Sequence, residues 1–160
     1  MPSVKNKWVK PGGSFNYTEG QRVLNQSGGT YPLLTAVQIT GVAGGVGVVT
    51  PASATDGASP GDNVAGRILF LRHAIPSGRY GVGTPWIIAT GTTQSPLDTS
   101  LATIGDPVYI DKDSGAPLAP TGEWTLTLPG AAGETARVIG YVLVVDSIIG
   151  SISFANTNAL

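Results

Sequence analysis

The chain of 160 residues contains no cysteine. This absence excludes disulfide bridges, metal sites built on cysteine and catalysis by a thiol. Charged residues form only 12% of the chain, which is about half the usual share. The net charge is −1, so the chain as a whole lacks the basic surplus typical of proteins that bind polyanions. We therefore expect no nucleic-acid partner.

Long apolar runs are missing as well. No stretch approaches 18 consecutive apolar residues, the length that indicates a membrane-spanning helix. Residues 1–5 lack the apolar segment and small-residue cleavage site of a signal peptide. These features predict a protein without a membrane partner that is made and kept in a cytosol.

Glycine and proline, in contrast, are abundant. The chain has 23 Gly and 12 Pro, yet 41% of its residues are hydrophobic. Disordered low-complexity chains combine many Gly and Pro with few apolar residues, so this composition indicates turns between many short strands. We predict an all-β protein with one β domain over residues 21–160 and an extended N-terminal arm over residues 1–20.

The few charges are unevenly distributed. Residues 1–22 carry four basic residues and one acidic residue, a balance of +3. Residues 89–160 carry two basic and seven acidic residues, a balance of −5. A basic arm on an acidic body indicates docking to an acidic neighbour or to the next copy of the same chain. Simple solubility is an equally open interpretation.

The arm contains the most suggestive local motif, Trp8 among Lys5, Lys7 and Lys10. An aromatic anchor with three cations is suited to a groove on a partner, where an extended segment adds a strand to a sheet edge. The alternative is a tail that folds back over its own domain.

Short apolar segments, several of them alternating, predict the strands of the domain. Residues 64–75 fit either a strand or a short helix, and we favour a strand; residues 97–101 fit a helical turn. The glycines of residues 41–47 argue against a helix there and indicate a strand with bulges. The expected strands are 21–25, 33–40, 42–50, 64–75, 86–90, 107–111, 116–118, 124–128, 137–145 and 150–154. Such short strands with regular spacing are typical of an antiparallel β-sandwich or β-barrel. Trp86 and Trp124 lie within expected strands, which favours the core or a subunit contact.

The C-terminal third has a recognisable order of motifs. The segment 104–111 (Ile-Gly-Asp-Pro-Val-Tyr-Ile-Asp) leads into Ser114-Gly115, then 137–143 (Arg-Val-Ile-Gly-Tyr-Val-Leu) and a short apolar strand at 152–154. This order resembles the small β-rich capsid decoration (cement) proteins of tailed phages. Those have a Gly-Asp-Pro-Val-Tyr-(Val/Ile)-Asp…Gly hairpin, a Val-Gly-x-(Val/Ala)-Leu strand and a closing strand. The long N-terminal half, including the arm, departs from that pattern and leaves the geometry of assembly open.

The resemblance implies a role as well as a fold. It implies an oligomer, most often a homotrimer, that sits on the outer surface of a virion capsid and binds the major capsid protein without catalysis. The protein would be made in the host cytoplasm. The alternative is a glycan- or receptor-binding β module of a phage fibre or tail. An enzyme, or an integral part of a head or tail, are further possibilities.

Reactive chemistry is poorly represented in the sequence. His73 is the only histidine, and no Gly-x-Ser-x-Gly elbow accompanies it. The segment from Asp111 fails the calcium-loop pattern at positions 5, 6 and 12, so a hairpin turn is the better interpretation. We expect no enzyme, no metal and no cofactor.

Overall fold

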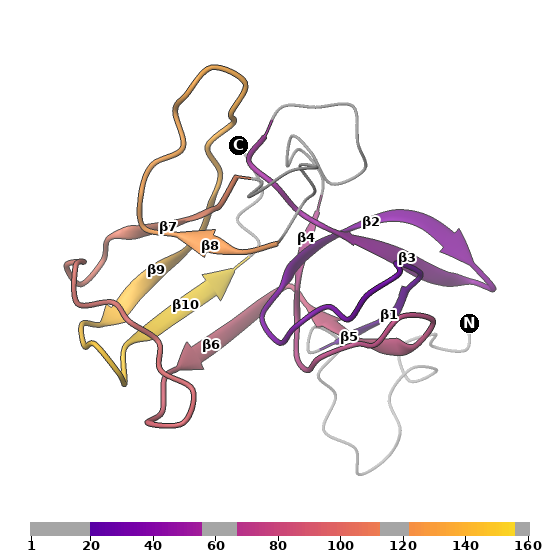
Figure 1. Ribbon diagram of the computed structural model, residues 1–160, viewed down its shortest axis with the longest axis horizontal. Coiled ribbons are helices and arrows are strands. Elements are labelled where there is room, and N and C mark those ends of the chain that lie inside the picture. The colour runs from indigo at the N-terminus through magenta and orange to yellow at the C-terminus, as the bar shows by residue number, and fades with distance from the viewer. Residues whose placement is uncertain (1–19, 56–66, 113–121, 156–160) are drawn as a thin grey trace, which may run out of the picture.

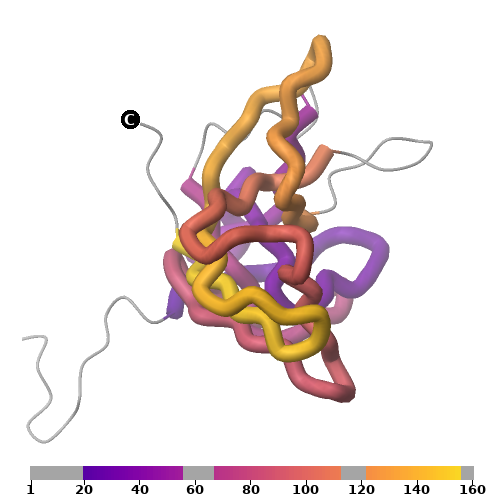
Figure 2. The backbone as a smooth tube through the Cα atoms, turned by 90° about the vertical axis from the view of Figure 1, so that its left-hand side faces the viewer, coloured from indigo at the N-terminus to yellow at the C-terminus, as the bar shows by residue number. Residues whose placement is uncertain are grey.

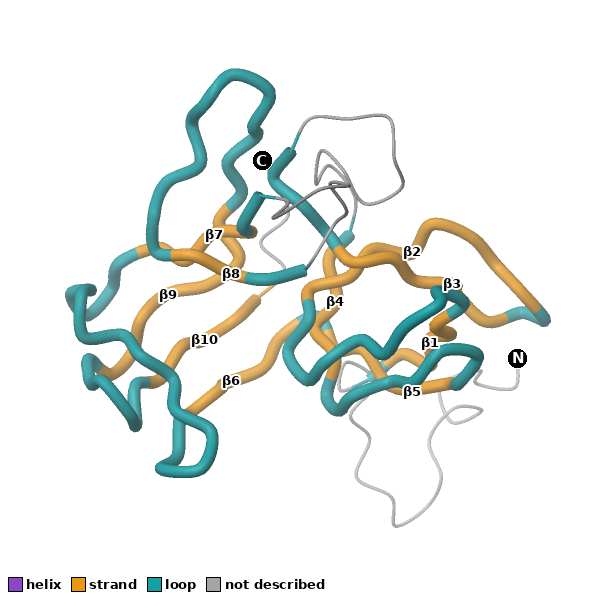
Figure 3. The backbone as a smooth tube through the Cα atoms, viewed as in Figure 1, coloured by secondary structure: helices purple, strands orange, loops and turns teal. Residues whose placement is uncertain are grey.

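The computed structural model of the chain describes residues 20–55, 67–112 and 122–155. These residues form ten strands joined by loops and contain no helix (Figure 3). Because no helix is present in this part of the chain, none there is long and apolar enough to cross a membrane. The prediction of an all-β fold is confirmed.

The first five strands close into a barrel in the order β1-β3-β2-β4-β5 (Figure 1). Its strands are β1 (Gln21–Asn25), β2 (Ala36–Ala43), β3 (Val46–Pro51), β4 (Ile68–Leu71) and β5 (Tyr80–Thr84). The pairs are antiparallel except for β1 and β3, which run parallel. Closure leaves this half of the domain without an open sheet edge.

The last five strands form an open sheet in the order β6-β10-β9-β7-β8. Its strands are β6 (Trp86–Thr90), β7 (Pro107–Ile110), β8 (Trp124–Thr125), β9 (Val138–Val144) and β10 (Ser151–Ala155). All pairs in this sheet are antiparallel. Figure 1 shows the sheet beside the barrel, with β6 and β8 as its two edges.

Strand β4 explains how the two halves join. Its sequence Ile-Leu-Phe-Leu is buried on both faces. Leu69 and Leu71 pack in the barrel interior, whereas Ile68 and Phe70 belong to the apolar cluster that includes Ile152 and Phe154 of the second sheet. A strand between two cores needs apolar residues at every position, so the strand expected within 64–75, rather than a helix, is present at Ile68–Leu71.

Several boundaries differ from those expected. The stretch expected as one bulged strand over 42–50 is a hairpin, because Gly44 and Gly45 both adopt positive φ, of 57° and 78°, the conformation of a type I′ turn. Strand β2 begins at Ala36 rather than at residue 33, after Leu34 bends the chain with φ 66°. The helical turn expected at 97–101 is wrong, since Leu97 instead bridges to Ile149.

Strand β4 (Ile68–Leu71) is shorter than the expected 64–75, and β5 (Tyr80–Thr84) was not among the expected strands. The other expected strands agree with the fold to within about two residues, except for β8. Strand β8 spans two residues rather than five, because the Thr127 N–H donates to Thr125 Oγ1 (3.1 Å) and turns the chain away from β7. The expected return strand over 116–118 lies outside the described residues.

Candidate functional site

The strands of the second sheet contain no charged residue. In the barrel strands the only charged residue is Arg22 of β1. Nearly all charge in the described part of the chain therefore lies in loops. A sheet that faces water on one side normally alternates apolar and polar residues, so an uncharged outer side marks this sheet as a candidate contact surface.

The outward side of the sheet carries large apolar side chains on both sides of β10. We name it the outer face and define it by Trp86 and Ile88 of β6 and Tyr141 and Leu143 of β9, whose exposed fractions are 49%, 57%, 46% and 41%. Ser153 of β10 pairs with Ile88 on one side and with Tyr141 on the other. A small residue between larger ones makes the outer face a broad apolar surface rather than scattered exposed residues.

The edge of the sheet at β6 is open. The Gly91 N–H donates to the Gly150 carbonyl (2.9 Å), in the same register that pairs Thr90 with Ser151 and Ile88 with Ser153. Hydrogen-bonded and non-hydrogen-bonded pairs alternate in an antiparallel ladder. The backbone groups of Ile88 and Thr90 therefore point away from β10, and within the described residues no hydrogen bond reaches them from that side.

This free edge lacks the usual protection. Natural edge strands are made short, charged, bulged or covered, so that they do not pair with other chains. The opposite edge strand, β8, is only two residues long. Strand β6, in contrast, has five residues, Trp-Ile-Ile-Ala-Thr, with no charge and no proline. It is a ready acceptor for an added strand.

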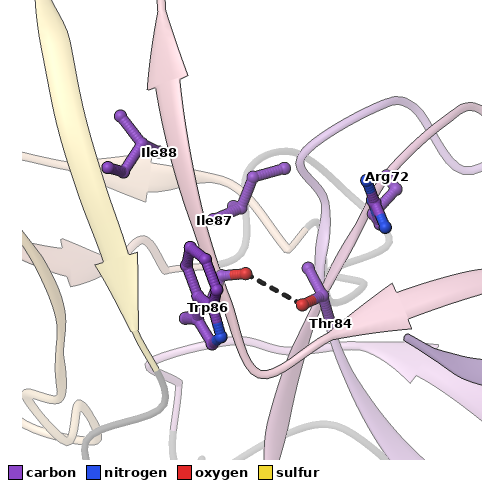
Figure 4. Close-up of a pocket in the computed structure, with 5 residues that line it drawn as sticks. All are labelled: Arg72, Thr84, Trp86, Ile87 and Ile88. Atoms are coloured by element: carbon purple, nitrogen blue, oxygen red, sulfur yellow. Dashed lines mark hydrogen bonds between the residues drawn. The ribbon is translucent and has the colours of Figure 1, made fainter. Parts of the chain in front are cut away.

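A shallow hollow lies beside the free edge (Figure 4). Arg72 and Thr84 line it from the barrel, and Trp86, Ile87 and Ile88 line it from β6. The Thr84 hydroxyl donates to the Trp86 carbonyl (2.8 Å) across it. Its volume is about 110 Å³, below the roughly 300–1,000 Å³ of pockets that enclose a small ligand, so it suits one side chain of a partner better than a whole ligand.

A second apolar surface forms the end of the sheet remote from the barrel. Loop 91–106 and the β9–β10 turn lie side by side there (Figure 2), joined by hydrogen bonds from Leu97 N to Ile148 O (3.0 Å) and from Thr99 N to Asp146 O (2.9 Å). We name it the distal tip; its exposed aliphatic residues are Leu101, Ile104, Val144, Val145, Ile148 and Ile149.

Two carboxylates hold the loops of the distal tip in shape. Asp146 Oδ1 accepts from the N–H groups of Ile148 (2.7 Å) and Ile149 (2.8 Å). Asp98 Oδ1 accepts from the N–H and the hydroxyl of Ser100 (2.9 and 2.7 Å). These hydrogen bonds stabilise the charged form and lower the pKa of both carboxyl groups below their ordinary value of 3.8. Both are therefore ionised at neutral pH and make the tip acidic.

The turn at Asp146 is expected to weaken in acid. A lowered pKa means that the stabilisation is present above the ordinary value of 3.8 and is lost as the pH falls through the lowered value. The amide signals of Ile148 and Ile149, followed by NMR during acidification, should shift with a midpoint below 3.8. In Asp146→Asn this transition should be absent. A midpoint at or above 3.8 in the unaltered protein would show that the two hydrogen bonds do not favour the charged carboxylate.

The residues singled out from the sequence are placed as follows. Trp86 lies in β6, half exposed on the outer face. Trp124 lies in β8, partly buried, with its ring 6.3 Å from that of Phe154, and it packs against the apolar cluster between the two halves. The arm residues Lys5, Lys7, Trp8 and Lys10 lie outside the described residues.

Sequence reasoning missed most of the outer face. Ile88, Tyr141 and Leu143 were expected only as strand residues, because the side that a strand presents to solvent depends on the order of strands in the sheet. The sequence of β9, Val-Ile-Gly-Tyr-Val-Leu-Val, was a usable signal, since a strand that is apolar at successive positions places apolar side chains on both faces of its sheet.

Groups suited to catalysis or metal binding do not gather in the described part of the chain. His73 is exposed, with its Nδ1 3.0 Å from the carbonyl oxygen of Ala74. No group of three or more His, Asp or Glu residues that could hold a metal ion occurs among the described residues.

Comparisons with protein-family models, with curated proteins and with solved structures find no match to this chain.

Proposed function

We propose that this chain is a structural capsid decoration protein that binds the outer surface of an assembled phage head and stabilises it through non-covalent contacts. It acts as an oligomer, a homotrimer, with the major capsid protein as its partner on the virion. The observation that carries the proposal is the second sheet, whose strands hold no charge and present Trp86, Ile88, Tyr141 and Leu143 to solvent. Contact surfaces of this kind, rather than a reactive centre, are what a cementing protein needs.

The physical effect follows from selective binding. A protein that binds the expanded, intact shell stabilises it by RT ln(1 + [L]/Kd), which is about 2.7 kcal/mol per site at a hundredfold excess over Kd. Equivalent sites repeat over the whole shell, so a modest affinity at each of them adds up to strong resistance against opening. No covalent chemistry is required for this effect.

The binding itself is tested with expanded, undecorated heads of the phage that encodes the chain. The purified protein should bind to them with a saturable stoichiometry. Tyr141→Lys places a charge in the middle of the outer face and should weaken binding by about tenfold or more, because a buried unpaired charge is costly. Leu128→Lys, at a residue with 61% exposure outside the outer face and the distal tip, is the matched control.

Binding that never saturates, or that both lysine variants retain equally, would contradict this role for the outer face.

A glycan- or receptor-binding module is the second candidate, favoured by the half-exposed Trp86 beside the hollow. Binding of the protein to a glycan array, lost in Trp86→Ala and without any binding to heads, would favour that candidate.

A further inference from the structure

The two halves of the domain carry opposite charge. In the described barrel half, residues 20–55 and 67–85, the charged residues are all arginines: Arg22, Arg67, Arg72 and Arg79. In the described sheet half, residues 86–112 and 122–155, two basic and six acidic residues give a balance of −4. Asp98 and Asp146 of the acidic half lie beyond the Thr90 end of β6. Backbone hydrogen bonds join the loop after β6, which carries Asp98, to the β9–β10 turn, which carries Asp146.

The arm joins the chain on the cationic side. Residues 1–19 carry three lysines and Glu19, a balance of +2 from side chains, and they lead into β1 at Gln21. A cationic segment is repelled by the arginine-bearing surface to which it is attached and is attracted by the acidic sheet half. Charge therefore favours docking of the arm on the acidic half of a molecule, which holds the second sheet, rather than on the barrel to which the arm is attached.

The arm is long enough to reach another molecule. Nineteen extended residues span up to roughly 60–70 Å, whereas a compact chain of this size has a radius of gyration of roughly 15 Å. Residues 3–10 lie between Pro2 and Pro11 and contain no proline. Each of these residues therefore keeps the N–H group that a strand needs for its ladder.

The free edge of β6 offers the matching acceptor. The backbone groups of Ile88 and Thr90 lack an added strand, and Arg72 and Thr84 of the barrel flank the Trp86 end of the edge (Figure 4).

We infer that residues 3–10 of one copy add as an antiparallel strand to the free edge of β6 in a neighbouring copy. Antiparallel polarity places Lys5 toward the acidic Thr90 end, and Lys7 and Trp8 toward the hollow beside Trp86. The contact is not self-complementary, so repeating it gives a closed ring where the rotation between copies closes and an open filament where it does not. The inference rests on the proposed function only for the expectation of an oligomer.

The contact is tested on the full chain in solution, without heads. A photoreactive benzophenone amino acid in place of Trp8 should, on illumination, give a covalent product of twice the 16.3 kDa chain mass on a denaturing gel. Mass spectrometry of that product should locate the attachment within residues 84–88. If the crosslink does not form but the protein still binds to heads, the arm contact alone is overturned. If the crosslink forms but the protein does not bind to heads, only the proposed function is overturned.

Two edge variants separate the β6 edge from other surfaces. Thr90→Pro removes an N–H that points out of the sheet, so the ladder with β10 is kept. It should reduce the crosslinked product by about tenfold or more, as expected when ladder hydrogen bonds to the partner are lost. Ile88→Lys should act in the same direction, and Leu128→Lys should leave the product unchanged. Circular dichroism checks that each variant keeps its β-sheet content.

Three results would overturn the inference. A crosslink confined to single chains would show that the arm folds onto its own domain. A double-mass product that persists in Thr90→Pro and Ile88→Lys would place the arm elsewhere. An oligomer that survives replacement of Lys5, Lys7 and Lys10 by glutamate but dissociates in Thr90→Pro would show that a second copy of β6, not the arm, occupies the edge.

Discussion

Replacing Phe154 by alanine is expected to lower the free energy of unfolding by about 3–5 kcal/mol. Phe154 of β10 is 1% exposed and lies between the two halves of the domain. Its ring centroid is 5.3 Å from that of Phe70 of β4 and 6.3 Å from that of Trp124 of β8. Removing the ring deletes buried apolar surface and leaves a cavity where the barrel meets the second sheet.

Urea denaturation followed by tryptophan fluorescence measures this loss, since Trp124 reports on the same cluster. Leu101→Ala is the control: Leu101 is 95% exposed at the distal tip, and a substitution there should change stability by less than about 0.5 kcal/mol. If Phe154→Ala cost no more than Leu101→Ala, the apolar cluster would not be what joins barrel and sheet.

Gly122→Ala is the second substitution with a large expected effect, about 2–5 kcal/mol of destabilisation. Gly122 has φ +67°, and a Cβ atom there would lie 2.4 Å from the Ala36 carbonyl oxygen. The residue also bridges to the barrel, because its carbonyl accepts from Ala36 N (2.8 Å) and its N–H donates to Ala52 O (2.9 Å). An added methyl group therefore forces the backbone at this contact to shift, which strains these two hydrogen bonds.

Gly44→Ala separates the cost of the left-handed backbone conformation from the cost of the steric contact with Ala36. Gly44 also has a positive φ, of 57°, but nothing lies within 4 Å of the position that its Cβ would take. It should therefore lose only the cost of the left-handed conformation, about 1–2 kcal/mol. Thermal unfolding of both variants gives the comparison, and equal losses would show that contact with Ala36 contributes nothing.

Local patterns in the sequence determine much of the fold. Strand β1 and strand β6 have the bounds expected from their apolar segments and flanking turns, because those signals are carried by neighbouring residues. The strands β9 and β10 were likewise expected, at 137–145 and 150–154, close to their observed bounds. The four apolar residues of β4 were ambiguous between a strand and a helix. All four are apolar because β4 packs against a core on each face, and these two cores exist only in the assembled fold.

Features that depend on distant pairing were not predictable. The turn at Gly44 and Gly45 is not such a feature, because a Gly-Gly pair between two apolar segments is a local hairpin signal, which the interpretation as a bulged strand missed. The free edge of β6 exists because its one neighbour in the sheet is β10, some 60 positions further along the chain. Similarly, loop 91–106 contacts residues 144–150 in the distal tip, and no local sequence motif predicts that contact. The candidate site therefore emerged from strand order, whereas only Trp86 could be singled out beforehand.

The free edge of β6 also makes the protein prone to aggregation. An uncharged, unpaired edge strand can pair unspecifically with other chains. If the arm covers this edge in the oligomer, its cationic residues keep the edge occupied by the correct partner. Assembly and protection against aggregation would then use the same contact.

The central claim is that the bound protein holds an assembled shell together, and the heat resistance of the shell measures this directly. Expanded heads that lack the protein are heated with and without it, and the temperature at which they release DNA is recorded. We expect the release temperature to rise with added protein and to level off once the sites are filled. Release at the same temperature with and without saturating protein would contradict the claim.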